Sequence, residues 1–250
     1  MTNSLEGRLA LIIGGSGGIG AATVRLFAGE GARIVITHTA RSAVSAATLV
    51  ESLPGTGHLA LPANVADTAS LLALRDMVRG RCGEVLNVLV NAAGFTKPVP
   101  HTDLDALDDA LIDRMFAVNW RGQFAVIRTF APMLKASGDG LIVSISSIAA
   151  QTGIGSSIAY CAVKAGIDVM TKSLGRALAP EIRVMGVAPG VVDTSFVAGR
   201  SADFNTKTAA ATPLRRIASP TDVAEAVLAC ATSLRFSTGT TVVVDGGRSL

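Results

Sequence analysis

The chain has 250 residues, of which 49% are hydrophobic, 16% are charged and 4% are aromatic. This apolar content excludes a disordered chain, and the near balance of 22 basic and 19 acidic residues gives no indication of a nucleic-acid-binding surface. Because aromatic residues are few, the core must consist of Ala, Val, Ile and Leu. That composition is typical of parallel strands that helices cover on both faces.

Short apolar runs alternate with longer helical patterns along the chain. We predict strands at Leu9–Ile13, Ile34–Thr37, Leu59–Pro62, Leu86–Val90, Leu141–Ser144, Arg183–Ala188 and Thr241–Val244. We predict helices at Gly18–Gly29, Ala43–Leu53, Ser70–Arg81, Leu111–Leu134, Ala159–Leu178 and from Thr221 to near Thr232. The alternation predicts an α/β fold with a doubly wound, seven-stranded parallel sheet, right-handed crossovers and helices on both faces.

No linker, charge block or internal repeat divides the chain, so residues 1–250 are expected to form a single domain. The least regular stretch is Asp193–Arg216, and we interpret residues 193–216 as a flap over a substrate site. The chain shows no signal-peptide pattern and no uninterrupted apolar stretch of about 18 residues, so we expect a cytoplasmic protein without membrane contact. The three cysteines and three histidines lack metal-ligand spacing, and no metal site is expected.

The first predicted strand runs directly into the sequence Gly14-Gly15-Ser16-Gly17-Gly18-Ile19-Gly20, and a helix follows. A glycine-rich turn in this place lets the backbone approach a pyrophosphate closely and directs the N–H groups of the helix terminus at it. The spacing G-x-x-x-G-x-G differs from the commoner G-x-G-x-x-G. By itself the motif therefore indicates either a dinucleotide site or a flexible loop.

Tyr160 is the only tyrosine, and Lys164 follows four residues later in a predicted helix, so both side chains lie on one helix face. A nearby cation stabilises a phenolate, which makes the pair a candidate acid/base group, although such pairs also occur on ordinary helix surfaces. Ser147 follows a predicted strand, at the edge of the sheet where open α/β folds bind ligands. A hydroxyl there can bind a substrate carbonyl oxygen while the tyrosine transfers a proton.

With these motifs, the chain resembles the short-chain dehydrogenase/reductase family over essentially its whole length. The motifs that carry the resemblance are Gly14-x-x-x-Gly18-Ile19-Gly20, Asn91-Ala92-Ala93-Gly94, Asn119, Ser147, Tyr160-x-x-x-Lys164 and Pro189-Gly190 with Thr194. The runs Pro213–Arg216 and Val244–Gly247 are similar to the branch of 3-oxoacyl-carrier-protein reductases and bacterial ketoreductases. The resemblance implies a single-domain Rossmann fold.

The resemblance also implies a role for each of four residues. Tyr160 would be the general acid in reduction and the general base in oxidation. Lys164 would favour the phenolate and hold the ribose hydroxyls of a nicotinamide cofactor. Ser147 would bind the carbonyl oxygen, and Asn119 would hold the water chain that returns a proton to Lys164.

The cofactor site predicted from the turn and the resemblance is larger. It comprises Gly14, Ser16, Gly17, Gly18, Ile19, Gly20, His38, Thr39, Arg41, Asn64, Val65, Asn91, Ala92, Ala93, Gly94, Tyr160, Lys164, Pro189, Gly190, Val192 and Thr194. Four positions depart from the family pattern without removing a catalytic group. Ile13 stands where a Thr is usual before the first glycine, Gly17 stands where NADP-preferring members often have Arg or Lys, Asn64 replaces a common Asp, and Met185 replaces a common Asn.

The end of the second predicted strand indicates which cofactor the chain prefers. NAD-specific sites carry an acidic residue about 20 residues after the glycine turn, where it bonds the ribose 2′-hydroxyl. Here His38 stands in that place, and no carboxylate lies between Gly31 and Glu51 to repel a 2′-phosphate.

Arg41 can pair with a 2′-phosphate, and the hydroxyls of Thr39 and Ser42 can add hydrogen bonds. Gly17 is counter-evidence, because NADP-preferring members of the family often carry a cation there. The sequence therefore favours NADP(H), with NAD(H) as the alternative.

These observations predict an oxidoreductase that transfers a hydride between NADP(H) and a carbonyl compound or secondary alcohol. The alternatives are a cofactor-sensing regulatory protein on the same fold, or a scaffold protein, and neither requires an acid/base relay. A homotetramer is expected from the resemblance, from the two apolar helices predicted at Leu111–Leu134 and Ala159–Leu178, and from the tail Gly239–Leu250. The substrate itself is not readable from the sequence.

Overall fold

One parallel sheet forms the centre of the structure, a computed structural model that describes residues 4–197 and 203–250. The strands are β1 (Leu9–Ile13), β2 (Arg33–His38), β3 (Leu59–Pro62), β4 (Val88–Asn91), β5 (Gly140–Ile145), β6 (Ile182–Pro189) and β7 (Thr240–Val244). They are hydrogen-bonded in the order β3-β2-β1-β4-β5-β6-β7, and each pairing is parallel. The predicted doubly wound, seven-stranded parallel sheet is confirmed.

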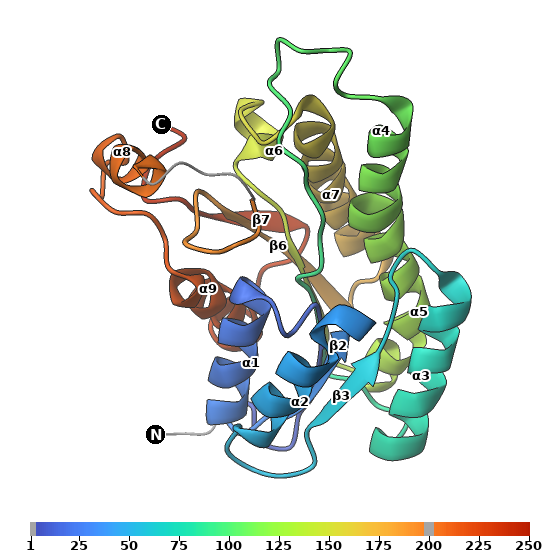
Figure 1. The fold of residues 1–250 in the computed structure, drawn as a ribbon. Coiled ribbons are helices and arrows are strands. Elements are labelled where there is room, and N and C mark those ends of the chain that lie inside the picture. Colours follow the sequence, from blue (N-terminus) through green and yellow to red (C-terminus); the bar gives the residue numbers. More distant parts are fainter. Residues whose placement is uncertain (1–3, 198–202) are drawn as a thin grey trace.

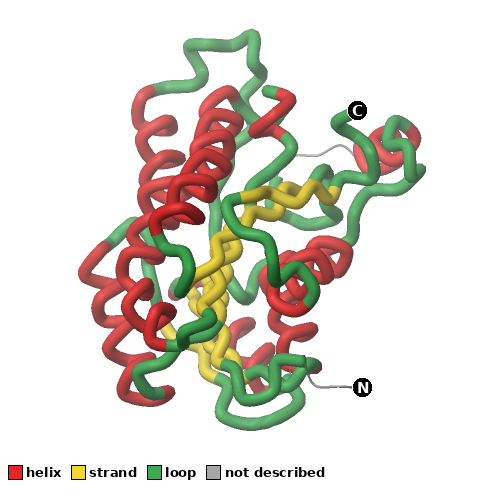
Figure 2. The backbone as a smooth tube through the Cα atoms, turned by 180° about the vertical axis from the view of Figure 1, so that it is seen from behind, coloured by secondary structure: helices red, strands yellow, loops and turns green. Residues whose placement is uncertain are grey.

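Helices cover both faces of the sheet (Figure 1; Figure 2). They are α1 (Gly18–Gly29), α2 (Ala43–Glu51), α3 (Thr68–Cys82), α4 (Asp109–Phe116), α5 (Gly122–Ala136), α6 (Ala149–Thr152), α7 (Ile158–Ala177), α8 (Phe204–Ala210) and α9 (Pro220–Thr232). The first core cluster joins α1, α2 and α9 to one face of the sheet. The second joins α3, α5 and α7 to the other face.

The alternation of side chains along each strand explains why the strand sequences are apolar throughout. In β1, Leu9, Leu11 and Ile13 belong to one core cluster, whereas Ala10 and Ile12 belong to the other. Because both faces of a doubly wound sheet are covered, both sets of side chains must be apolar. The helices begin at polar caps: the Ser219 hydroxyl accepts from the Asp222 N–H in a capping box that opens α9.

The observed boundaries of the predicted strands and helices differ by at most two residues from those predicted, with one exception. The single helix predicted at Leu111–Leu134 is divided into α4, a π-helical turn at Ala117–Arg121, and α5. Such turns insert an extra residue into a helix and often occur at functional sites. The predicted flap 193–216 contains the short helix α8, while its residues 198–202 lie outside the described part of the chain.

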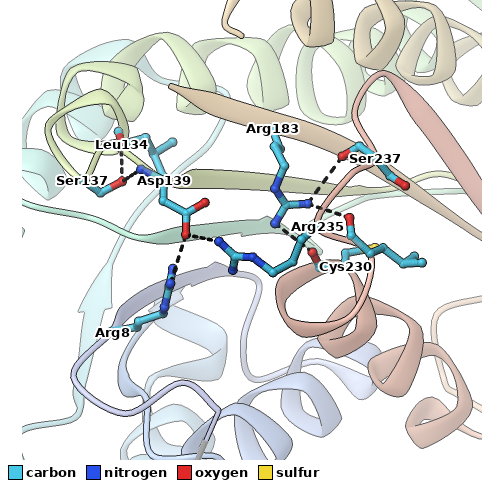
Figure 3. A network of polar contacts seen from close by, with 9 residues as sticks. Arg8, Leu134, Ser137, Asp139, Arg183, Cys230, Arg235 and Ser237 are labelled. Atoms are coloured by element: carbon cyan, nitrogen blue, oxygen red, sulfur yellow. Dashed lines mark hydrogen bonds and ion pairs between the residues drawn. The ribbon is translucent and has the colours of Figure 1, made fainter. Parts of the chain in front are cut away.

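A network of arginines links the amino ends of the strands (Figure 3). The Asp139 carboxylate accepts hydrogen bonds from Arg8 and Arg235, and Arg183 donates to the carbonyl oxygens of Cys230, Leu234 and Ser237. Burial raises the pKa of Asp139, but the bonds from Arg235 and Arg8 outweigh it, so the pKa lies below its usual value. This network ties the sheet together at the edge opposite the one that carries the predicted site residues.

Candidate active site

A cavity of about 960 Å³ opens at the carboxyl ends of the strands. Residues that follow each of the strands β1 to β6 line it, and so does the C-terminal segment after β7. In open α/β sheets this edge is the ligand-binding edge, because the chain order reverses there beside β1. The cavity therefore lies where the sequence places both the glycine turn and the candidate catalytic residues.

The glycine turn between β1 and α1 has no room for side chains. A Cβ at Gly14 would lie 2.8 Å from backbone atoms of Ala93, and Gly14 also has a φ of +76° that disfavours other residues. A Cβ at Gly18 would collide with the side chain of Thr194. The turn is thus packed directly against the segments that follow β4 and β6.

Thr37 supplies the hydroxyl whose usual source is absent at Ile13. The Gly14 N–H donates to Thr37 Oγ1 over 3.0 Å, so the glycine turn is tied to β2. The sequence shows that the hydroxyl is missing at Ile13 but not that Thr37 replaces it, because this hydrogen bond connects two strands that are neighbours only in the folded sheet.

The start of helix α7 positions the candidate acid/base pair. Ser157 caps the helix, and its hydroxyl accepts from the Tyr160 N–H over 3.2 Å. Tyr160 and Lys164 both line the cavity, and the Lys164 ammonium nitrogen lies 5.5 Å from the centroid of the tyrosine ring. Ser147 lines the same cavity from the loop after β5, and its hydroxyl accepts from the Ala149 N–H. The structure therefore brings these three predicted residues together.

Lys164 is almost fully buried, and its Nζ donates to the Ile145 carbonyl at the end of β5 over 2.7 Å. Burial lowers the pKa of Lys164 to about 8, and the nearby Asp168 carboxylate opposes part of this effect. The lysine can therefore gain or lose its charge close to neutral pH, which an exposed lysine does not do.

Asn119 lies in the π-helical turn and is fully buried, and it is absent from the cavity lining. Its Oδ1 accepts from the Phe95 N–H and its Nδ2 donates to the Phe95 carbonyl, both over 2.7 Å. The side-chain amide therefore holds the segment after β4 in place. One amide N–H and one lone pair of Oδ1 remain beyond these two hydrogen bonds, so the water-holding role of Asn119 stays a prediction.

Most of the predicted cofactor residues line the cavity. These are Gly14, Ser16, Gly17, Gly18, Ile19, Gly20, His38, Thr39, Asn64, Val65, Ala92, Ala93, Gly94, Tyr160, Lys164, Pro189, Gly190, Val192 and Thr194.

Two predicted cofactor residues do not line it. Asn91 is buried in the sheet at the end of β4, and its amide atoms have no partner among the described residues. Arg41 is exposed in a 3₁₀ turn at Ala40–Ser42, where the Thr39 and Ser42 side chains are engaged in capping the turn.

Several cavity residues were not identified from the sequence. Phe95, Arg114, Phe196 and Arg248 all line the cavity, and the Phe196 ring lies 6.3 Å from that of Tyr160. No local pattern marks them, since they come from loops and from a helix face whose orientation depends on tertiary packing.

Over residues 4–197 and 203–250, we find neither a group of His, Cys, Asp and Glu that could hold a metal nor a helix that could span a bilayer.

Comparison with known proteins shows similarity over nearly the whole chain. A family model described as Enoyl-(Acyl carrier protein) reductase matches residues 14–249. The chain is 38% identical to cis-4-hydroxycyclohexanecarboxylate dehydrogenase of Sinomonas cyclohexanicum, over 99% of this chain and 98% of that protein. It is 30% identical to 3-oxoacyl-[acyl-carrier-protein] reductase of Escherichia coli (strain K12), over 98% of each chain.

Solved structures show the same similarity. The structure of 3-ketoacyl-(acyl-carrier-protein) reductase from Brucella melitensis, complexed with NADH, has a TM-score of 0.88 and 30% sequence identity, over 99% of this chain and 100% of that chain. The names of these proteins agree with the motifs identified in the sequence and with the cavity that the structure builds from them. The chain therefore belongs to the short-chain dehydrogenase/reductase family, and it is an oxidoreductase of the kind that acts on C=O or CH–OH groups.

Proposed function

We propose that this chain transfers a hydride between NADP(H) and a ketone or secondary alcohol, with Tyr160 as the general acid and base. The observation that carries the proposal is the convergence of Ser147, Tyr160 and Lys164 in one cavity with the glycine turn. A regulatory protein that only senses a cofactor needs the turn but has no use for an acid/base relay.

The residues of the turn and of β2 fit a dinucleotide. Gly14, Gly18 and Gly20 let the turn pack tightly, and no side chain caps the N-terminus of α1, where N–H groups favour an anion such as a pyrophosphate. No carboxylate lines the cavity within the described part of the chain. When bound, a nicotinamide dinucleotide supplies or accepts the hydride, and the protein supplies position and charge.

The protein's own residues then perform the proton transfer. The Ser147 hydroxyl donates to the carbonyl oxygen and orients it. The Tyr160 hydroxyl gives its proton to that oxygen in reduction and takes it back in oxidation. The Lys164 cation stabilises the phenolate that reduction leaves behind, and Asn119 acts as a positioning residue through the Phe95 backbone. Residues 193–216 are proposed to form the substrate flap.

The direct test is oxidation of NADPH in the presence of a panel of ketones, 3-oxoacyl thioesters and enoyl thioesters. Turnover of ketones or 3-oxoacyl thioesters supports the proposal. Turnover of enoyl thioesters alone would assign the chain to C=C reduction, the reaction in the description of the matching family model. Tight NADPH binding without turnover of any member of the panel would favour the sensing alternative.

The charge of Lys164 predicts the pH dependence of the reaction. Because burial lowers the pKa of Lys164 to about 8, the lysine loses its charge as the pH rises through that value. We therefore expect kcat/KM for ketone reduction to fall above about pH 8. Asp168→Asn removes the carboxylate that raises the pKa, so the midpoint of this fall moves to lower pH. A pH–rate profile measures both effects, and a midpoint that stays in place or rises would contradict the assignment.

The preference for NADP(H) is tested by the ratio of kcat/KM with NADPH to that with NADH. We expect this ratio to exceed one in the wild type, because β2 ends without a carboxylate that would repel a 2′-phosphate. Arg41→Ala is expected to lower the ratio by about tenfold through loss of a charge-assisted bond. The control is Arg75→Ala, a half-buried residue of α3 that pairs with Asp76 and is absent from the cavity lining. A wild-type preference for NADH would contradict the proposed preference for NADP(H). A ratio that Arg41→Ala leaves unchanged would contradict the role of Arg41.

We also propose a homotetramer. Phe116 and Trp120, at α4 and the π-helical turn, and Val169 on α7 are exposed apolar residues on helices that pack together. In addition, β7 lies at an edge of the sheet, where its backbone can pair with or pack against a second copy. Two separate surfaces of this kind are what a dimer of dimers requires. Light scattering at micromolar concentration is expected to give the mass of four chains, and a monomer mass would contradict the proposal.

A further inference from the structure

The cavity contains more positive charge than the proposed reaction uses. Its lysine and arginine side chains are Lys164, Arg114 and Arg248, and within the described part of the chain no Asp or Glu lines it. Lys164 belongs to the acid/base pair. The proposed function gives no role to Arg114 or Arg248, and of these two Arg114 has a side chain whose placement the structure defines by a specific contact.

Arg114 is held over an aromatic ring with its donors free. It extends from α4, and the central carbon of its guanidinium lies 4.0 Å from the centroid of the Phe95 ring. Stacking of this kind engages the face of the guanidinium and leaves the N–H groups at its edge available for hydrogen bonds. In residues 4–197 and 203–250 no carboxylate pairs with Arg114, and no hydrogen-bond acceptor takes its N–H groups.

Phe95, whose ring lies under the Arg114 guanidinium, packs close to the proposed catalytic residue Tyr160. The side-chain amide of Asn119 makes two hydrogen bonds to the Phe95 backbone, which hold in place the main chain that carries the ring under the guanidinium. Phe95 and Tyr160 pack against one small cluster, formed by Val99, Leu111, Met115 and Ala159. Helix α4, which carries Arg114, packs against α7, which carries Tyr160 (Figure 1). The Arg114 guanidinium therefore contacts the Phe95 ring, and Phe95 packs against the same cluster as Tyr160, the proposed proton donor.

The cavity lining also includes apolar side chains, among them Ile154, Phe196 and Val118. A substrate that fits both features has an apolar carbon skeleton, a carbonyl group at Tyr160 and an anionic oxygen group that reaches Arg114. A guanidinium binds a carboxylate through two parallel hydrogen bonds, which makes it selective for that group. A phosphate on a long carrier arm would lie much farther from the reacting carbonyl.

We propose that Arg114 is a specificity-determining residue that selects carbonyl substrates carrying a carboxylate on the same small skeleton. The inference rests on the proposed function, because it names the substrate class of the same cavity. It concerns the part of the substrate that does not react, so its test can be separated from the test of the reaction itself.

The experiment compares a keto acid with its neutral methyl ester, for which 4-oxopentanoate and methyl 4-oxopentanoate are suitable probes. kcat and KM are measured for both with NADPH and with NADH, in wild type, Arg114→Gln, Arg114→Lys and Arg128→Gln. Arg128 is exposed on α5 and absent from the cavity lining, so its variant is the matched control. A charge-assisted hydrogen bond increases binding affinity by a factor on the order of 10–100.

The wild type is expected to prefer the acid, and Arg114→Gln to lower the acid-to-ester ratio of kcat/KM by about 10–100-fold, mainly through KM for the acid. Arg114→Lys keeps part of the preference because it keeps the charge, and Arg128→Gln keeps all of it. Equal losses for acid and ester would show a structural role only, and an unchanged ratio would show no role, so either result overturns the inference. Turnover of the ester without preference for the acid overturns it while the proposed function stands. If neither probe nor any ketone is reduced, the proposed function fails and the inference with it.

Discussion

Tyr160→Phe is expected to lower kcat for ketone reduction by about 10²–10⁴-fold, the range that general acid–base transfer contributes. The substitution removes only the phenolic oxygen, which is the proton donor of the proposed reaction. The ring keeps its neighbours, since it packs against Phe196 and against the cluster that includes Val99 and Met115. Cofactor binding should therefore change little, and titration of the variant with NADPH measures this separately from turnover.

The neighbouring residue offers a matched control for this prediction. Cys161 follows Tyr160 on α7, is partly buried and is absent from the cavity lining. Burial raises the pKa of its thiol, so it is no candidate for a reactive thiolate near neutral pH. Cys161→Ala should keep turnover within about twofold of the wild type, as expected for a substitution outside a reacting site. A Tyr160→Phe variant with near-wild-type kcat would show that another group donates the proton.

The features that the sequence predicts well are those that depend on residues close together in the chain. The strands were predictable because each is a short apolar run, and the glycine turn because its glycines follow a strand and open a helix. The spacing of Tyr160 and Lys164 is likewise a local property of one helix. These elements determine where the sheet ends and where the acid/base pair stands.

The features that the sequence does not predict depend on contacts between distant segments. The π-helical turn at Asn119 interrupts a sequence whose apolar pattern continues through it, so periodicity indicates a single helix. The bond between Gly14 and Thr37 joins two strands, and the contact between Arg114 and Phe95 joins a helix to a loop. No pattern within a window of a few residues contains this information.

Asn119 and Arg41 show that the role of a residue, too, depends on contacts that its position in a motif does not reveal. The sequence predicts a role for each from its position in a motif, but the two side chains lie in different surroundings. Asn119 is buried with both amide groups bonded to Phe95, whereas Arg41 is exposed beside the cavity. A motif identifies which residue stands at a position, but its partners depend on how neighbouring segments pack. The Arg41→Ala measurement is therefore more informative than the motif for cofactor preference.

Gly20→Ala is expected to impair both cofactor binding and stability. A Cβ at Gly20 would lie closer than 3.0 Å to the Gly14 carbonyl oxygen and 3.0 Å from the Gly15 Cα. These are backbone atoms of the turn itself, so no side chain can rotate away to make room. The turn between β1 and α1 must open, and the N–H groups aimed at a pyrophosphate move with it. Overpacking of this kind typically destabilises a fold by about 1–3 kcal/mol.

The expected results are a fall of several degrees in the melting temperature and an increase of about 10–100-fold in the Kd for NADPH, if the strain is released by opening the turn. Gly29→Ala is the matched control, because Gly29 ends the same helix and a Cβ there would meet nothing within 4 Å. That variant should bind NADPH like the wild type and be equally or slightly more stable, since Ala favours a helix over Gly. Equal behaviour of the two variants would show that the tight approach of Gly20 to Gly14 does not determine the binding site. A loss confined to Gly20→Ala would locate the cofactor at this turn.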